Sequence, residues 1–188
     1  MLVTLTFLLF NAPVLYAAKV IFCQDPSIRY SPGWYAGYST PTQDIYLETN
    51  DTDAASLRLV LPSNATSVEY VGYKRAGGSL YGYCIDCEND GSYELQTVNA
   101  SDPSVGTDEA AALQSIIFTM TLDPSKQHTL VVYNLPDQQF NNSGKINLDH
   151  LLVQVPDSNV PDETTAGPRI YHRRIINLLT HILQIPRP

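Results

Sequence analysis

Residues 114–122 read QSIIFTMTL, and every second side chain in this segment is large and apolar. The side chains that share one face of an extended chain here are Ile116, Phe118, Met120 and Leu122. Side chains of a β-strand alternate between its two faces, so this spacing predicts a strand with one buried face.

Comparable segments recur along the middle of the chain. Further strands are expected at residues 56–61, 67–74, 80–83, 92–98, 128–134 and 146–155. Short turn sequences rich in Asn, Asp, Gly and Ser separate these segments, and only residues 108–113 (DEAAAL) have a helical composition. The pattern predicts an all-β fold, a two-sheet antiparallel β-sandwich of jelly-roll type.

The composition excludes two classes of protein. The chain has 188 residues, of which 44% are hydrophobic, which is enough for the core of one domain and excludes a wholly disordered chain. It has 19 Asp and Glu against 11 Lys and Arg, a net charge of −8. This balance argues against a nucleic-acid partner held by a basic surface.

The N-terminal segment indicates secretion. Residues 1–18 carry no charged side chain and hold an apolar run from Leu2 to Phe10. A short apolar segment that ends in small residues is typical of a signal peptide, here with cleavage expected after Ala18. An uncleaved anchor is the alternative, but Asn11 and Pro13 interrupt the segment, which is short for a bilayer span. We expect a secreted, extracellular protein of the cell wall or cell surface.

Four N-x-[ST] sequences also support passage through the secretory pathway. Together with a signal-like segment they predict an N-glycosylated surface. Their acceptor asparagines are Asn50, Asn64, Asn99 and Asn141.

The chain has three cysteines. Cys84 and Cys87 form a CxxC motif that precedes the turn sequence 88–91 (ENDG), and we predict a small-loop disulfide between them. A thioredoxin-like redox pair would need a helix at the first cysteine and a βαβ context. Cys23 then has no partner cysteine. The alternative is a disulfide between Cys23 and either Cys84 or Cys87, and the sequence does not distinguish these pairings.

We divide the chain into a signal peptide (1–18), a β-sandwich domain (19–155), a Pro-rich polar linker (156–168) and a basic tail (169–188). The tail holds four of the 11 basic residues and spaces its apolar residues as a helix would. It predicts a short amphipathic C-terminal helix. A helix packed on the acidic domain, or a frayed tail, is the favoured interpretation, and contact with a membrane surface or a partner is the functional alternative. Polar residues interrupt the apolar ones, which argues against a membrane span.

Several motifs and their order carry a resemblance to a known group of proteins. They are DPSIRYSPGW at 25–34, VGY at 71–73, HTLVVYN at 128–134 and INLDH at 146–150. Over about residues 20–155 the chain resembles secreted, galactose-binding-like β-sandwich proteins of mushroom-forming fungi. The resemblance implies a jelly-roll architecture similar to carbohydrate-binding modules. Many such proteins continue into a long linker, one membrane-spanning helix and a cytoplasmic tail, and this chain departs from that pattern after Pro156.

The 12 tyrosines suggest how a ligand could be held. Aromatic faces stack on sugar rings, and neighbouring polar groups bind the hydroxyls. Tyr35, Tyr38 and Tyr81 are the ligand-binding candidates, because each lies close to a glycine and is expected to be exposed. The single tryptophan, Trp34, is expected to pack between the sheets instead.

The motifs of catalysis and of metal binding are absent from the sequence. No G-x-S-x-G nucleophile motif and no G-K-[ST] phosphate loop occurs, so we assign no catalytic residue and no cofactor. Asp25, Asp44 and Asp149 are possible calcium ligands by residue type, but calcium needs 6–8 converging oxygens and the sequence has no contiguous acidic loop. Solvated turns are the favoured interpretation, and no metal site is assigned.

We therefore expect a non-catalytic extracellular binding or adhesion module at the fungal cell surface, directed at carbohydrate. The ligand would be a cell-wall polysaccharide or a surface glycan. The alternative is a structural or protein-interaction component of the wall or matrix. A glycoside-active enzyme is the third hypothesis.

Overall fold

The computed structural model describes residues 16–53, 55–87, 95–106 and 108–156. Within these residues the fold is all-β, as predicted, with antiparallel sheets and three short 3-10 turns. Two of the turns are η1 (Pro103–Val105) and η3 (Gln138–Phe140). The expected helix at 108–113 is only the one-turn η2 (Glu109–Ala111). The amphipathic tail and all of the linker after Pro156 lie outside the described residues.

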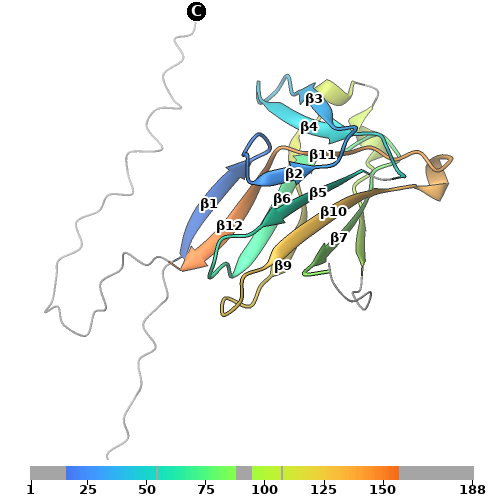
Figure 1. Cartoon of the computed structure of the whole chain (residues 1–188). Coiled ribbons are helices and arrows are strands. Elements are labelled where there is room, and N and C mark those ends of the chain that lie inside the picture. The colour runs from blue at the N-terminus through green and yellow to red at the C-terminus, as the bar shows by residue number, and fades with distance from the viewer. Residues whose placement is uncertain (1–15, 54, 88–94, 107, 157–188) are drawn as a thin grey trace, which may run out of the picture. The chain divides into compact units, whose positions relative to one another are not determined.

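Two larger sheets form the sandwich (Figure 1). The five-stranded sheet has the order β2 (Ile28–Tyr30), β5 (Ser56–Val60), β10 (Thr129–Leu135), β7 (Leu80–Ile85), β8 (Gln96–Asn99). The four-stranded sheet has the order β1 (Tyr16–Phe22), β12 (His150–Pro156), β6 (Ser67–Tyr73), β9 (Gln114–Thr121). Non-sequential neighbours such as β5 and β10 bring distant segments together, as in jelly rolls.

The core lies between the two sheets. Alternate residues of each strand point inward, so Leu57 and Leu130 from one sheet pack in the same cluster as Leu151 from the other. The ring of Phe118 stacks on Tyr83, with ring centroids 4.0 Å apart. Trp34 packs at the edge of this core, and its indole nitrogen donates to the carbonyl of Ser56 at 3.1 Å.

The predicted orientation of Ile116 in strand 114–122 is wrong. Phe118 is buried, but Ile116 is 55% exposed, although both were expected on one side of the strand. The cause is a β-bulge opposite the Tyr70/Val71 step, where Tyr70 pairs with Phe118 and Val71 with Ile116. The additional residue in β9, Ile117, shifts the alternation, so that Ile116 faces solvent.

A third, smaller sheet joins β3 (Tyr35–Tyr38), β4 (Ile45–Thr49) and β11 (Ile146–Leu148). One of its faces contributes Leu148 to the main core. The other face carries a buried ion pair, in which fully buried Arg75 donates to Glu48 at 2.7 Å. Lys145 in turn lies 3.4 Å from Glu48. Lys145 also lies 2.8 Å from a second acid, Glu109, so two basic and two acidic side chains balance one another. A buried arginine needs such compensation.

Asn147 connects this small sheet to β6. Its side-chain amide is fully buried and pairs twice with the backbone of Tyr73, accepting from the N–H at 2.6 Å and donating to the C=O at 2.8 Å. A Cβ on Gly72 would lie 2.6 Å from the Asn147 amide oxygen, so glycine is needed there. The hydroxyls of Tyr70 and Tyr81 both donate to the Asn147 carbonyl. The Asn147 side chain therefore supplies the hydrogen bonds between β11 and β6 that two paired backbones would otherwise make.

The start of β1 overlaps the predicted signal peptide. Residues Tyr16, Ala17 and Ala18 pair with β12 in antiparallel register. Cleavage after Ala18 stays a prediction, and it would remove these three residues from the strand. In the described part of the chain, no helix is both long and apolar enough to cross a membrane.

Replacing Asn147 by leucine tests its role. The change leaves the buried N–H and C=O of Tyr73 without partners, at about 1–3 kcal/mol each. We expect the free energy of unfolding, measured by urea denaturation of unglycosylated protein, to fall by about 2–5 kcal/mol. The matched control is Asn50→Leu at an exposed position, with an expected change within about 0.5 kcal/mol. Equal losses in the two variants would contradict the role assigned to Asn147.

Candidate functional site

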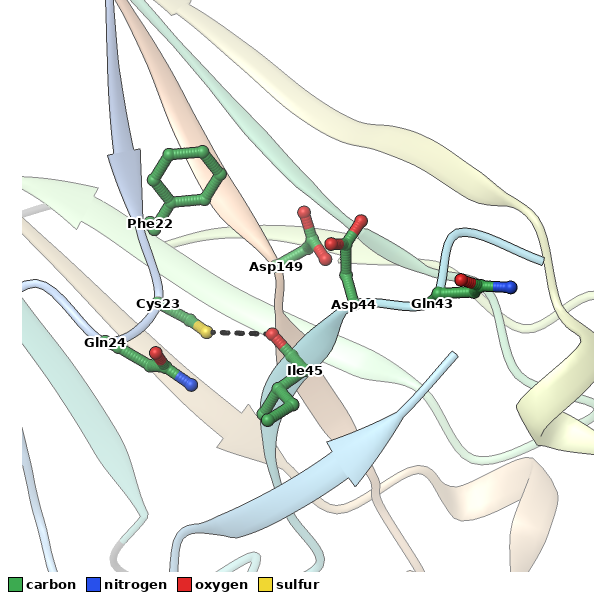
Figure 2. A pocket seen from close by; sticks show the side chains of 7 residues that line it. All are labelled: Phe22, Cys23, Gln24, Gln43, Asp44, Ile45 and Asp149. Atoms are coloured by element: carbon green, nitrogen blue, oxygen red, sulfur yellow. Dashed lines mark hydrogen bonds between the residues drawn. The ribbon is translucent and has the colours of Figure 1, made fainter. Parts of the chain in front are cut away.

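A pocket of about 280 Å³ opens where three distant segments meet (Figure 2). The segments are the turn after β1, the end of the β3–β4 hairpin, and the junction between β11 and β12. The lining residues are Phe22, Cys23, Gln24, Gln43, Asp44, Ile45 and Asp149.

Backbone hydrogen bonds hold these segments in place. The N–H of Cys23 donates to the carbonyl of Asp149 at 2.9 Å, which joins the first segment to the third. In the hairpin, the N–H of Ser39 donates to the carbonyl of Asp44, and Gln43 donates back to Ser39. Gln43, in the connection between β3 and β4, has a φ of 60°, a left-handed backbone conformation. The pocket walls are thus set by main-chain contacts.

Asp149 forms the floor of the pocket and is almost fully buried. Its Oδ1 accepts from the Tyr73 hydroxyl at 2.9 Å, and its Oδ2 accepts from the Gln114 amide at 2.7 Å. His150 Nδ1 lies 2.5 Å from the same Oδ2. These contacts compensate the burial of the carboxylate and fix its orientation. In Figure 2 the carboxylates of Asp44 and Asp149 point into the same space, and Asp44 is exposed.

The Cys23 thiol lies on the wall and donates to the carbonyl of Ile45 at 3.4 Å (Figure 2). Burial raises its pKa from 9.0 to about 11, and the nearby charges of Asp149 and Asp44 add to the shift. At neutral pH the sulfur is therefore a thiol, whereas a nucleophilic cysteine needs a thiolate. Cys23 contributes packing and no reactive group.

The rim of the pocket is apolar. Phe22 is 63% exposed and Ile45 is 50% exposed, and the Phe22 ring lies 6.1 Å from the His150 ring. An exposed aromatic ring beside two carboxylates and two amides suits a small ligand that has both hydroxyl groups and C–H faces. Among the described residues, no group of three or more His, Cys, Asp or Glu side chains could hold a metal ion.

The structure places the three tyrosines that the sequence suggested as ligand-binding residues in three different environments. Tyr38 is 51% exposed and pairs in register with Ile45 of the pocket rim. Tyr35 is 42% exposed but pairs with Glu48, on the opposite face of the small sheet. The prediction for Tyr81 is wrong, because this residue is fully buried in the middle of β7. Its hydroxyl bonds to Asn147, and burial raises its pKa to about 12.

Sequence reasoning missed Phe22, Gln24 and Gln43, because these residue types form no motif. Asp44 and Asp149 are two of the three acids that the sequence offers as calcium ligands, and the structure brings them to one pocket. Asp25 does not line this pocket, and its carboxylate accepts from the N–H and the hydroxyl of Ser27. Those bonds lower the Asp25 pKa and make it a turn cap.

The described residues include the predicted disulfide and all four predicted glycosylation sites. Cys84 and Cys87 are joined in a disulfide, and Cys23 is the free cysteine. Glycan attachment at the four asparagines stays a prediction, and all four of them are exposed: Asn50, Asn64, Asn99 and Asn141.

Comparison with known proteins supports the fold. No protein-family model and no curated protein matches this sequence. Among solved structures, a two-domain esterase active on acetylated mannans is 14% identical with a TM-score of 0.50. The match covers 80% of this chain and 40% of the esterase, so this chain spans about two fifths of that protein's length.

Two further solved structures have lower scores. A family 6 carbohydrate-binding module is 14% identical, covers 72% of this chain and 92% of its own, and has a TM-score of 0.43. A Podospora anserina GH26-CBM35 β-(1,4)-mannanase is 13% identical, with 77% and 29% covered and a TM-score of 0.44. At these identities the likeness concerns the fold alone, the β-sandwich described above.

The high pKa of Cys23 predicts slow alkylation. A rise from 9.0 to about 11 lowers the thiolate fraction at pH 8 about a hundredfold. We expect iodoacetamide to modify the native protein at pH 8 at about one hundredth of the rate in guanidinium chloride, or more slowly still because the sulfur is buried. Mass spectrometry with the disulfide intact measures both rates. A native rate within a few fold of the unfolded rate would show that the thiol is open and ionised.

Proposed function

We propose that this protein is a non-catalytic extracellular module that binds a sugar unit of a cell-wall polysaccharide or surface glycan in the pocket between Phe22 and Asp149. The observation that carries the proposal is a small pocket with an exposed aromatic rim and fixed polar groups. Its volume of about 280 Å³ is just below the usual range of small-molecule sites, about 300–1,000 Å³, which suits one sugar residue.

Each lining group has a matching part on a sugar. The Asp44 carboxylate can accept from two adjacent hydroxyls, and the amides of Gln24 and Gln43 can both donate and accept. The ring of Phe22 offers an apolar face for the C–H side of the sugar. Tyr38, next to Ile45 in register, extends that face beyond the rim.

The contacts of Asp149 support a binding role over hydrolysis. In a two-carboxylate glycosidase, one acid must give a proton and the other must attack or activate water. Both Asp149 oxygens already accept hydrogen bonds, from Tyr73, Gln114 and His150. The group is therefore held as a fixed acceptor that shapes the pocket floor.

The extracellular location at a fungal cell surface is part of the proposal. It is supported by the signal-like segment at 1–18 and by the exposure of all four glycosylation asparagines. Expressed in a eukaryotic secretory host, the full chain should appear in the medium, begin at Lys19, and lose mass on treatment with a peptide-N-glycosidase. Retention inside the cell without glycan would contradict this part of the proposal.

A second candidate is a structural or protein-contacting component of the wall. It is supported by exposed apolar side chains on the outer side of the four-stranded sheet. Phe22 pairs with His150, His150 with Val71 and Val71 with Ile116, which places all four in one row across the sheet. At the two ends of this row, Phe22 is 63% and Ile116 is 55% exposed.

A pull-down of the full chain on insoluble mannan, glucan and chitin tests sugar binding. Mannan is included because the esterase that shares the fold acts on acetylated mannans. We expect retention on one of these polymers and release by its soluble fragments. Phe22→Ala and Asp44→Asn should each weaken binding about tenfold, equivalent to about 1.4 kcal/mol.

Matched controls are Leu113→Ala, at another exposed apolar residue, and Asp53→Asn, at another exposed acid. Both should bind as the unchanged protein does. No retention on any polymer, or equal weakening by the controls, would reject the pocket as the sugar site and favour the protein-contacting alternative.

A further inference from the structure

The pocket at Phe22 carries negative charge. Its lining holds two carboxylates, Asp44 and Asp149, and the described residues that line it include no lysine and no arginine. The two carboxylates point into the same space (Figure 2). Besides burial, both of their charges raise the pKa of the Cys23 thiol on the pocket wall. A ligand in this pocket therefore meets a field that favours a positive group and opposes an anion.

Asp44 is the acid whose charge the protein leaves uncompensated. The residue is exposed, and within the described part of the chain no hydrogen bond or ion pair engages its carboxylate. Gln24 and Gln43 line the same pocket but bring no charge. Both oxygens of the Asp44 carboxylate can therefore accept from a ligand.

Asp149 adds a second acceptor on the pocket floor. A carboxylate has about four acceptor positions. Gln114 and His150 occupy the two positions on Oδ2, and Tyr73 occupies one on Oδ1. One position on Oδ1 remains for a donor of the ligand. Asp149 is only 4% exposed, so this position is largely shielded from water, where a hydrogen bond to a charged group is strengthened.

A sugar amine has the chemistry that suits these groups. In its protonated form it presents three N–H donors and one positive charge, as the ammonium group of lysine does. Hydrogen bonds to ionised groups are about twice as strong as those between neutral groups, so an amine gains more here than a hydroxyl. The exposed ring of Phe22 adds a face for the sugar ring, and an aromatic face also attracts a cation.

We propose that the pocket at Phe22 binds an amino sugar, with the ammonium group of a glucosamine unit held by Asp44 and by the open position of Asp149. This inference rests on the proposed function, because it names the sugar class for the same pocket. N-acetylation removes the positive charge of the amine and with it the preference. Uronic acids and sulfated sugars are excluded, because the two carboxylates repel their anionic groups.

The test compares three oligosaccharides of equal length and equal β-1,4 linkage that differ only at C2 of each sugar. They are oligomers of glucosamine, N-acetylglucosamine and glucose, which carry an amine, an amide and a hydroxyl there. Calorimetric titration of the full chain at mildly acidic pH, where the amine is protonated, measures each dissociation constant. We expect the glucosamine oligomer to bind about tenfold more tightly than either neutral oligomer, or better. Asp44→Asn should reduce this preference to about threefold or less.

The matched control is Asp53→Asn, which removes the same charge from another exposed acid and should leave the preference unchanged. Spermine is the probe for positive charge without a sugar ring, and it should bind about tenfold more weakly than the glucosamine oligomer. An equal loss of preference in Asp53→Asn, or spermine binding as tight as that of the sugar, would reduce the effect to general electrostatics and overturn the inference.

Two further outcomes separate this inference from the proposed function. Equal or tighter binding of a neutral oligomer, or retention on mannan alone, would overturn the amino-sugar inference and leave the proposed function standing. No binding to any oligomer or polymer would overturn both.

Discussion

The double hydrogen bond between the Asn147 side chain and the Tyr73 backbone is the contact on which the arrangement of the sheets depends. At this point the chain leaves the small sheet as β11 and enters the four-stranded sheet as β12. An amide side chain can pair with both groups of a backbone unit, so the chain changes sheets here without leaving buried polar groups unpaired. Gly72 is the residue that permits the close approach.

The position of the candidate pocket follows from this junction. Asp149 comes two residues after Asn147, and Tyr73 contributes both the backbone bonds to Asn147 and the hydroxyl that fixes Asp149. The turn after β1 is tied to the carbonyl of Asp149, and the hairpin before β4 completes the wall. Structural support and the polar floor of the pocket are therefore one network. A sugar would meet groups that are already oriented, which reduces the entropy lost on binding.

The sequence allowed the fold class and most strands after residue 55 to be predicted, because alternation is a local property of each segment. It did not predict β1 to β4, and it joined β11 and β12 into one strand. It misplaced Ile116, because a bulge depends on the partner strand. It also misplaced Tyr81, because a neighbouring glycine suggested an exposed side chain where β7 buries it. The pocket was beyond prediction, since Phe22, Gln43 and Asp149 meet only through the order of strands in the sheets.

The most direct test of the central claim is a titration of the isotope-labelled protein with the soluble fragments of its retained polysaccharide, followed by backbone and side-chain NMR shifts. The account predicts saturable shifts in Phe22, in the side-chain amides of Gln24 and Gln43, and in Asp44, with Tyr35 on the opposite face unchanged. Shifts centred on Tyr35 and the ion pair of Glu48 and Arg75, with the pocket unaffected, would contradict it.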